Sequence, residues 1–254
     1  MSIATYQTRV PDTLIAFCEA MANLMPTVER HLYRDLEVGR NITDLKREYQ
    51  RYYGINARQF NAVYATLKGK IKSRIECHKR QIKQLQSGIA DLEKRLKQWE
   101  KQVEKIPLTC PLKPGDKTPR QMLRWKIHQK KRRLATLKAK LERLKDSKPK
   151  LIFSGRKLWN AQFNPQANGY SSHQQWLNEW QSNRNSQFYF VGSKDETAGC
   201  QVCQLSMDGT TGTLKIRVPP ALERKFGKYI TTNAIHFAYG QSDVNWAHEA
   251  HPTC

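Results

Sequence analysis

Two long runs of apolar residues at helical spacing occupy residues 71–150, and they constrain the fold more than any other feature. Apolar side chains recur mostly every third or fourth position, and the first run skips one position at His78. Alternating steps of three and four are typical of the buried seam of a coiled coil. The seam residues are Ile71, Ile75, Ile82, Leu85, Ile89, Leu92, Leu96, Trp99, Val103 and Ile106, followed by Leu123, Ile127, Leu134, Leu137, Leu141 and Leu144.

The segment between the two runs ends the first helix. Residues 107–119 contain four prolines and one glycine. Proline cannot continue a helix, because it lacks the backbone N–H and its ring clashes with the preceding turn. Two seams of similar length joined by a compact loop should fold back on each other. The pattern therefore predicts an antiparallel coiled-coil hairpin with arms at 70–106 and 120–148.

The second arm is strongly basic. Residues 120–150 contain 13 Lys and Arg against two acidic residues, a net charge of +11 out of +22 for the whole chain. Structural coiled coils usually intersperse opposite charges, because like charges at helical spacing repel. An arm whose cations lack partners has a polyanion as its natural counterion. The alternative interpretation is a solvated basic face without a ligand.

The composition of the chain favours nucleic acid over a membrane as partner. The isoelectric point is near 9.9. No segment is long and apolar enough to cross a bilayer, and the N-terminus lacks the pattern of a signal peptide. A membrane-surface role would need a free hydrophobic face, but the hairpin already uses the apolar seam. We therefore expect a cytoplasmic protein that binds nucleic acid and no membrane.

The order of predicted elements indicates an α+β fold, with a helical lobe inserted in a small antiparallel β-barrel-like domain. Residues 1–11 are predicted to form the first strand of the β-domain, and residues 12–150 the helical lobe with its hairpin. Residues 151–240 are predicted to form an antiparallel β-domain of about four to six strands. Residues 241–254 are predicted to be an irregular tail.

Individual elements follow from local patterns. A helix with an apolar face is predicted from Asp12 or Thr13 to Leu32, with a kink or break at Pro26. A short helix from Thr43 should end at Gly54, and Asn56 should cap a helix of more than about forty residues. The predicted strands are short β-prone runs at 2–10, 151–153, 187–191, around Leu205, at 213–218 and at 229–239.

The six cysteines are scattered along the chain, which favours reduced thiols over a disulfide framework. Cys200 and Cys203 form a single CxxC motif. Zinc needs four ligands, and only His248, His251 and Cys254 could complete the set. Cys200 and Cys203 are therefore weak metal candidates, and buried thiols in a turn are the default interpretation.

Two further groups of residues are candidates for phosphate and base contacts. A predicted turn at 192–199 exposes backbone amides beside Lys194, and Arg184 lies at the other end of the preceding strand. A cluster of aromatic residues lies among Asn, Gln and Ser. These aromatic side chains could stack on unpaired bases or pack the base of the hairpin against the β-domain, and packing is favoured for most of them. They are Trp159, Phe163, Tyr170, Trp176 and Trp180.

The run RNSQFYFVGSKDETAG at residues 184–199 resembles the TnpB-related (OrfB) proteins of bacterial insertion sequences. The sequences LKIRVP at 214–219, FAYG at 237–240 and FSGRKL at 153–158 are also similar to that family. So is the order of strand, helices, basic coiled coil and β-region, and the similarity covers most of residues 1–240. The resemblance implies the lineage of RNA-guided DNA nucleases related to type V CRISPR effectors.

Proteins of that family have a β-barrel wedge interrupted by a helical recognition lobe, followed by a RuvC-like nuclease domain. That domain carries three metal-binding carboxylates and often a four-cysteine zinc element. After Tyr239 only Asp243 and Glu249 remain, and Cys200 stands where the family has Asn. No catalytic residue is carried over, and a divalent metal cofactor is expected only for the missing nuclease domain. We therefore expect a truncated insertion-sequence gene whose product does not cleave DNA alone.

The predicted function is nucleic-acid binding by part of a TnpB-like, transposase-associated RNA-guided nuclease. The expected partners are guide-like RNA and target DNA, and a separate transposase or nuclease chain is a further candidate. One alternative is a nuclease that uses unrecognised residues, and another is a coiled-coil regulatory or interaction protein. The predicted nucleic-acid-binding residues are Arg124, Lys126, Lys130, Lys131, Arg132, Arg133, Lys138, Lys140, Lys157, Arg184 and Lys194.

Overall fold

A computed structural model describes residues 5–9, 11–107, 118–192, 200–209 and 211–250. The chain combines helices with one antiparallel sheet, which confirms the α+β class. It divides into two compact units, which are described separately below. Unit 1 comprises Met1–Gly69 with Ile152–Cys254, and unit 2 comprises Lys70–Leu151.

Unit 2 consists of the greater part of α3 (Ala57–Lys105) and all of α4 (Pro119–Asp146). Helix α3 is 49 residues long, which confirms the predicted long helix. Asn56 precedes it and exchanges hydrogen bonds with Gln59, the Asn56 Oδ1 accepting from the Gln59 N–H at 2.8 Å. These bonds satisfy two backbone donors that the start of a helix would otherwise leave unpaired.

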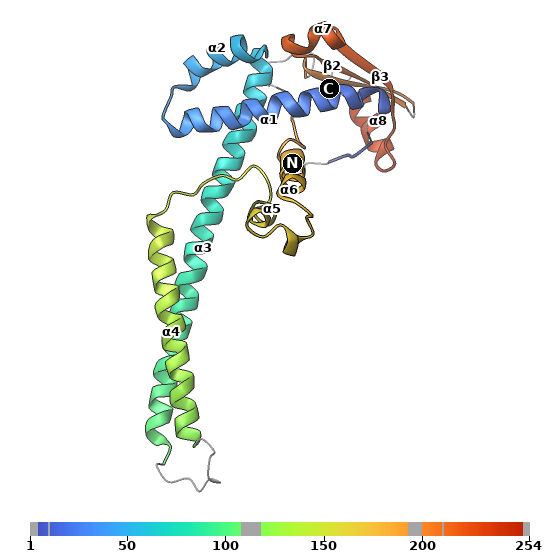
Figure 1. Cartoon of the computed structure of the whole chain (residues 1–254). Coiled ribbons are helices and arrows are strands. Elements are labelled where there is room, and N and C mark those ends of the chain that lie inside the picture. The colour runs from blue at the N-terminus through green and yellow to red at the C-terminus, as the bar shows by residue number, and fades with distance from the viewer. Residues whose placement is uncertain (1–4, 10, 108–117, 193–199, 210, 251–254) are drawn as a thin grey trace. The chain divides into compact units, whose positions relative to one another are not determined.

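The two helices of unit 2 lie side by side and antiparallel (Figure 1). Leu96 and Val103 of α3 form a buried cluster with Ile127 of α4, and partly buried residues on both helices pack around it. The seam residues within 92–103 and 123–134 therefore pack together between the two helices. The connecting segment was predicted at 107–119, and residues 108–117 of it lie outside the described residues.

Helix α4 begins with a capping box. Thr118 precedes the helix, and its hydroxyl accepts a hydrogen bond from the Gln121 N–H at 3.1 Å. The Gln121 side chain accepts from the Thr118 N–H at 3.0 Å, and Pro119 occupies the first helical position, where its missing N–H has no consequence. The proline-rich segment thus ends in a well-defined helix start.

Unit 1 has a helical core made by α1 (Ile15–Glu37), α2 (Ile42–Tyr53) and the start of α3. A short 3₁₀ turn, η1 (Asp12–Leu14), precedes α1. The predicted apolar face of the first helix is confirmed, because its large side chains are buried together with those of α2 and α3. These buried residues are Leu14, Phe17, Met21, Met25, Val28, Leu32, Leu45, Tyr49, Phe60, Val63 and Leu67.

The predictions for two residues of this core, Pro26 and Gly54, had different outcomes. Pro26 was expected to kink or split the first helix; α1 runs through Pro26 as one helix, so the helix is not split there. Gly54 ends α2 as predicted, with a left-handed backbone conformation (φ 57°). A Cβ atom at Gly54 would lie 2.9 Å from both the backbone N and the Cβ of Ala221, so glycine is required there on two grounds.

The sheet of unit 1 contains β1 (Cys203–Asp208), β2 (Thr211–Arg217) and β3 (Tyr229–Ile235) in the order β1-β2-β3. Both pairings are antiparallel, with Leu205 opposite Leu214 in the first. The predictions at Leu205 and at 213–218 are confirmed. Within the predicted segment 229–239, the strand covers Tyr229–Ile235.

Fewer strands form than the four to six predicted, because three predicted strands have no pairing among the described residues. Residues 5–9 are not a strand: Tyr6 packs edge-on against Phe237, and the Thr8 hydroxyl donates to the His236 carbonyl. Residues 151–155 and the described segment 187–192 also lack strand structure. Each segment is β-prone, but a strand also needs the backbone edge of a neighbour.

Short helices complete unit 1. The connection between β2 and β3 holds η4 (Pro220–Leu222) and α7 (Glu223–Phe226). The aromatic segment forms α5, two 3₁₀ turns and α6, with the bounds Arg156–Asn160, Ala161–Phe163, Gln166–Asn168 and His173–Arg184.

The C-terminal segment corrects another prediction. Residues 241–254 were predicted to be an irregular tail, but Gln241–Ala250 form helix α8. Val244 of α8 is buried with Ile235 and Phe237, so an apolar contact with the sheet stabilises this helix. Within the described residues, the helices include none whose length and hydrophobicity would let it span a bilayer.

Candidate nucleic-acid interface

The candidate interface is the solvent-facing side of α4. Ile127 and Leu141 are buried in the seam and Leu134 packs against the same apolar cluster, so the residues on the opposite side of α4 face outward. Six of the eight predicted binding residues on this helix take part in no ion pair within the described part of the chain. Five of the six are exposed, and Lys130 is half-buried. These six are Arg124, Lys126, Lys130, Arg132, Arg133 and Lys140.

The other two predicted residues of α4 have acidic partners on α3, which corrects the expectation that this arm lacks partners for its cations. Lys131 Nζ lies 2.6 Å from Glu100 Oε1, and Lys138 Nζ lies 2.6 Å from Glu93 Oε1. The four side chains are 40% to 58% exposed, so water screens each pair and it contributes little to stability, about 0 to 1 kcal/mol. Their main effect is to neutralise two cations and fix the helix register.

A groove of about 310 Å³ lies between α3 and α4 and gathers three of the cations. Its lining includes Arg95 from α3 and Lys130 and Arg133 from α4, with Asp91 as an acidic neighbour. Gly88 also lines the groove, and a Cβ atom added there would meet no atom within 4 Å. The backbone at Gly88 therefore faces open space, and three positive groups around the groove make it suitable for a phosphate.

The sequence analysis identified neither Arg95 nor Gly88 as part of a binding site. Glycine inside a helix costs roughly 1 kcal/mol of helix stability relative to alanine. A glycine at such a position, beside basic residues, indicates a surface where the missing side chain leaves room. Arg95 could not be distinguished from the other cations of α3, because its proximity to Lys130 depends on the register between the two helices.

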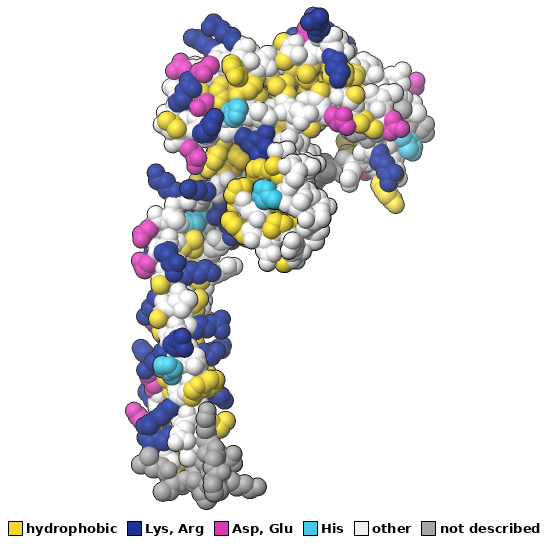
Figure 2. Space-filling view, in the orientation of Figure 1, with side chains coloured by type: hydrophobic (Ala, Val, Ile, Leu, Met, Phe, Trp, Pro, Cys, Tyr) yellow, Lys and Arg dark blue, Asp and Glu magenta, His cyan; other side chains and the backbone are white. Residues whose placement is uncertain are grey.

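The overall charge of the α3–α4 pair is visible on its surface. Lys and Arg side chains cover much of unit 2 in Figure 2, with isolated acidic groups between them. Because the cations continue over several turns of α4, the positive potential extends along the helix and does not centre on one pocket. An extended polyanion matches such a surface better than a small anionic ligand.

The predicted binding residues of unit 1 differ in their accessibility to a ligand. Lys157 is exposed on α5, whereas Arg184 is half-buried at the end of α6. The Arg184 guanidinium stacks on Trp180, with its central carbon 4.2 Å from the ring centroid, and burial lowers the pKa of Arg184. Arg184 therefore has a packing contact that limits its access to a ligand. Lys194 lies outside the described residues.

The tryptophans of the aromatic segment pack mainly against one another. Trp176 and Trp180 stack with ring centroids 5.6 Å apart, and Trp159 lies 5.4 Å from Trp180. The Trp176 indole N–H donates to the Leu158 carbonyl at 2.7 Å, which fixes α6 on α5. These rings form a small local core.

Cys200 and Cys203 remain unpaired thiols. Burial, with a smaller contribution from Cys200, raises the pKa of Cys203 to about 11. Among the described residues no three His, Cys, Asp or Glu side chains are grouped to hold a metal ion. His251 and Cys254 lie outside those residues, as does the side chain of His248, so the zinc prediction stays a prediction.

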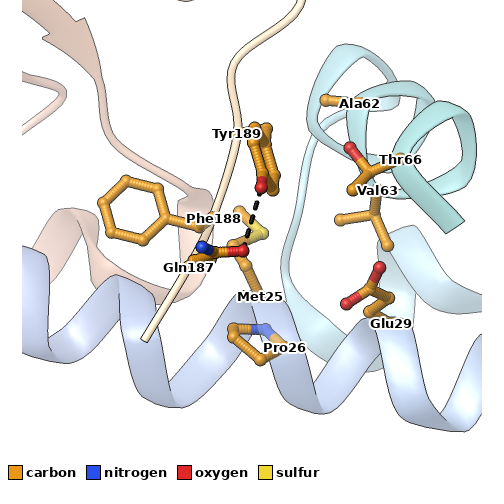
Figure 3. A pocket seen from close by; sticks show the side chains of 9 residues that line it. All are labelled: Met25, Pro26, Glu29, Ala62, Val63, Thr66, Gln187, Phe188 and Tyr189. Carbon is orange, nitrogen blue, oxygen red and sulfur yellow. Dashed lines mark hydrogen bonds between the residues drawn. The ribbon is translucent and has the colours of Figure 1, made fainter. Parts of the chain in front are cut away.

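A second cavity lies in unit 1 between α1, the start of α3 and residues 187–189 (Figure 3). Pro26 and Met25 line one side, and Tyr189 donates a hydrogen bond to Gln187 Oε1 at 3.0 Å beside it. Its volume of about 20 Å³ has room for one water molecule. The cavity is too small for a nucleotide or a cofactor.

Comparisons of the chain with protein-family models, with curated proteins and with solved structures found no match.

Proposed function

We propose that this protein binds nucleic acid through the basic outer face of α4. The observation that supports the proposal most directly is the row of exposed cations between Arg124 and Lys140 that lack an acidic partner among the described residues. Such side chains are hydrated and surrounded by counterions in the unbound state. A phosphate chain would replace those counterions, and their release favours binding.

We further propose that the protein is the nucleic-acid-binding part of a TnpB-like, transposase-associated RNA-guided nuclease. In this proposal α3 and α4 form a coiled-coil hairpin, the sheet of unit 1 belongs to a β-barrel-like wedge, and the partners in the cytoplasm are guide-like RNA and target DNA. The motif at 184–199 and the order of the elements support this assignment. The proposal assigns nucleic-acid binding to the described residues and assigns them no cleavage step.

A titration of binding against salt tests the basic interface. Fluorescence anisotropy with a labelled RNA hairpin and with a DNA duplex should show that log K falls linearly with log salt concentration. Replacing four unpaired cations of α4 by glutamine should reduce the slope by about 3, because each phosphate contact contributes about 0.7 to 0.9 to it. The four substitutions are Arg124→Gln, Lys126→Gln, Arg132→Gln and Lys140→Gln.

A matched control removes the same charge from exposed positions of unit 1. Glutamine at Arg47, Arg51, Arg224 and Lys225 should leave the slope nearly unchanged. Equal losses in the two quadruple variants would show that only net charge matters, and an unchanged slope in the α4 variant would contradict the interface. Magnesium-dependent cutting of DNA by the pure chain would assign catalysis to it as well.

The alternative of an interaction protein without nucleic-acid binding would use the apolar seam to dimerise. Within one chain, however, Leu96 and Val103 are already buried against Ile127. This contact leaves less apolar surface for a second copy. Size-exclusion chromatography with and without RNA separates the two functions, because an interaction protein would elute as a dimer in both runs.

A further inference from the structure

We infer that Trp125 of α4 is a stacking platform for an unpaired base, so that the basic face binds single-stranded nucleic acid next to any duplex. This inference rests on the proposed nucleic-acid binding and adds the kind of strand that is bound. Trp125 is 58% exposed and was not among the residues predicted to bind. It has no described ring or cation–π contact.

The position of Trp125 on the helix places it opposite the seam. Leu123 and Ile127 flank it at two residues on either side, and successive residues of a helix are rotated by about 100°. Trp125 therefore points away from α3, and its high exposure agrees with this direction. The indole contributes nothing to the contact between the two helices, so packing does not account for it.

Met122 extends the apolar surface by one turn. It is 48% exposed and lies three residues before Trp125, so the two side chains are neighbours on the same face. A single exposed apolar residue is ordinary, whereas two adjacent large ones form a patch that favours a partner. Hydrophobic side chains are visible between the Lys and Arg side chains of unit 2 in Figure 2.

The charges around the patch identify the partner. Arg124 and Lys126 flank Trp125 along the chain, and Arg132 lies two turns further on the same face, about 10 Å along the axis. All three are exposed and have no described ion pair. An apolar protein partner would leave these cations unpaired in the interface, whereas a nucleic-acid strand supplies a phosphate beside each base. An aromatic ring within a basic track is the arrangement that binds single strands.

The face also offers hydrogen-bonding groups. His128 and Gln129 lie three and four residues after Trp125 and are exposed. Both carry donors and acceptors that could reach the edge of a stacked base. Stacking itself does not discriminate strongly between bases, so binding at this patch should tolerate different sequences.

The test compares the full chain with Trp125→Ala, Trp125→Phe and Trp246→Ala. Trp246 is a matched control, because it is 69% exposed on helix α8 and has no Lys or Arg within four residues of it. The probes are labelled 12-residue oligouridine and oligothymidine, which distinguish RNA from DNA. Inorganic polyphosphate serves as a strand of charges without bases.

We expect Trp125→Ala to bind both oligonucleotides about 5- to 140-fold more weakly, the range that corresponds to a stacking energy of about 1 to 3 kcal/mol. Trp125→Phe should retain most of the affinity, and Trp246→Ala should equal the wild type. Affinity for polyphosphate should be the same in all four proteins, because no charge changes. A loss for only one oligonucleotide would support stacking and identify RNA or DNA as the partner.

Three results would overturn the inference. If Trp125→Ala binds the oligonucleotides like the wild type, the ring does not stack. If the affinity of Trp125→Ala for oligonucleotides and for polyphosphate falls by the same factor, the ring does not act on the bases. If it only changes the oligomeric state, the patch is a protein contact. Wild-type binding to neither oligonucleotides nor polyphosphate would instead refute the proposed function, and the inference with it.

Discussion

Lys131 and Glu100 form an ion pair between α4 and α3, with Nζ and Oε1 2.6 Å apart. A second pair, Lys138 with Glu93, has the same length and lies seven residues later in α4 and seven residues earlier in α3. Seven residues are about two helical turns, so the pairs lie on one side of the antiparallel contact. They divide the basic helix into neutralised positions and positions with no described acidic partner.

Removing the acidic partners should strengthen nucleic-acid binding. In the variant Glu93→Gln with Glu100→Gln, Lys131 and Lys138 lose their partners and the arm gains two units of positive charge. The salt slope measured by anisotropy should become steeper by roughly 1 to 2, and the free energy of unfolding should fall by no more than about 1 kcal/mol per pair. Glu104→Gln is the control, since Glu104 is exposed on α3 outside these pairs. A weaker or unchanged affinity in the double variant would count against the interface.

The seam should carry most of the stability of unit 2. Ile127 is 8% exposed and packs in the cluster with Leu96 and Val103. Ile127→Ala should lower the free energy of unfolding by about 2 to 4 kcal/mol, because it leaves a cavity between the helices. Met122→Ala, on the exposed face of the same helix, should change it by less than about 0.5 kcal/mol. Urea denaturation followed by circular dichroism measures both, and equal effects would contradict the assignment of the two faces.

His78 occupies the position that the first seam was expected to skip. It is 8% exposed, and its Nε2 has no hydrogen-bond partner among the described residues. His78→Leu should therefore raise the free energy of unfolding by about 1 kcal/mol, since it replaces a buried polar atom by an apolar one of similar size. His128→Leu provides the comparison at an exposed position and should have little effect. Thermal denaturation would reveal an error if His78→Leu melted at a lower temperature than the wild type.

Cys203 should react slowly with thiol reagents. Its pKa is raised to about 11, mainly by burial. At pH 8 about one molecule in a thousand would carry the reactive thiolate, against roughly one in four for a thiol with an ordinary pKa near 8.5. Mass spectrometry after brief iodoacetamide treatment should find Cys203 the least alkylated of the described cysteines, with Cys203→Ser as the assignment control.

The raised pKa of Cys203 also makes the stability of the fold decrease as the pH rises. The folded-state pKa of Cys203 is above that of the unfolded chain, so the neutral thiol is favoured in the fold. The stability contribution is complete below pH about 8.5 and is lost as the pH rises towards 11. Wild-type protein should lose more stability than Cys203→Ser over this range. Identical pH profiles would contradict the raised pKa of Cys203.

Local patterns predicted the helices well and the strands less well. The seam, the cap at Asn56 and the stop at Gly54 depend on residues within a few turns of each other, and all three occur. The segments 5–9 and 187–191 have β-prone residues but no described strand partner. β-structure depends on a neighbouring edge that lies far away in the chain, so composition alone overestimated it.

The candidate site also has some properties that follow from local residue spacing and others that depend on contacts between distant residues. The sequence by itself determined that one arm is basic and which of its faces is apolar, because helical periodicity assigns both from residue spacing. Only the tertiary structure decided that Lys131 and Lys138 are paired and that Arg95 joins Lys130 at a groove. The physical reason is that these properties depend on the register between two helices, which side chains separated by dozens of residues set together.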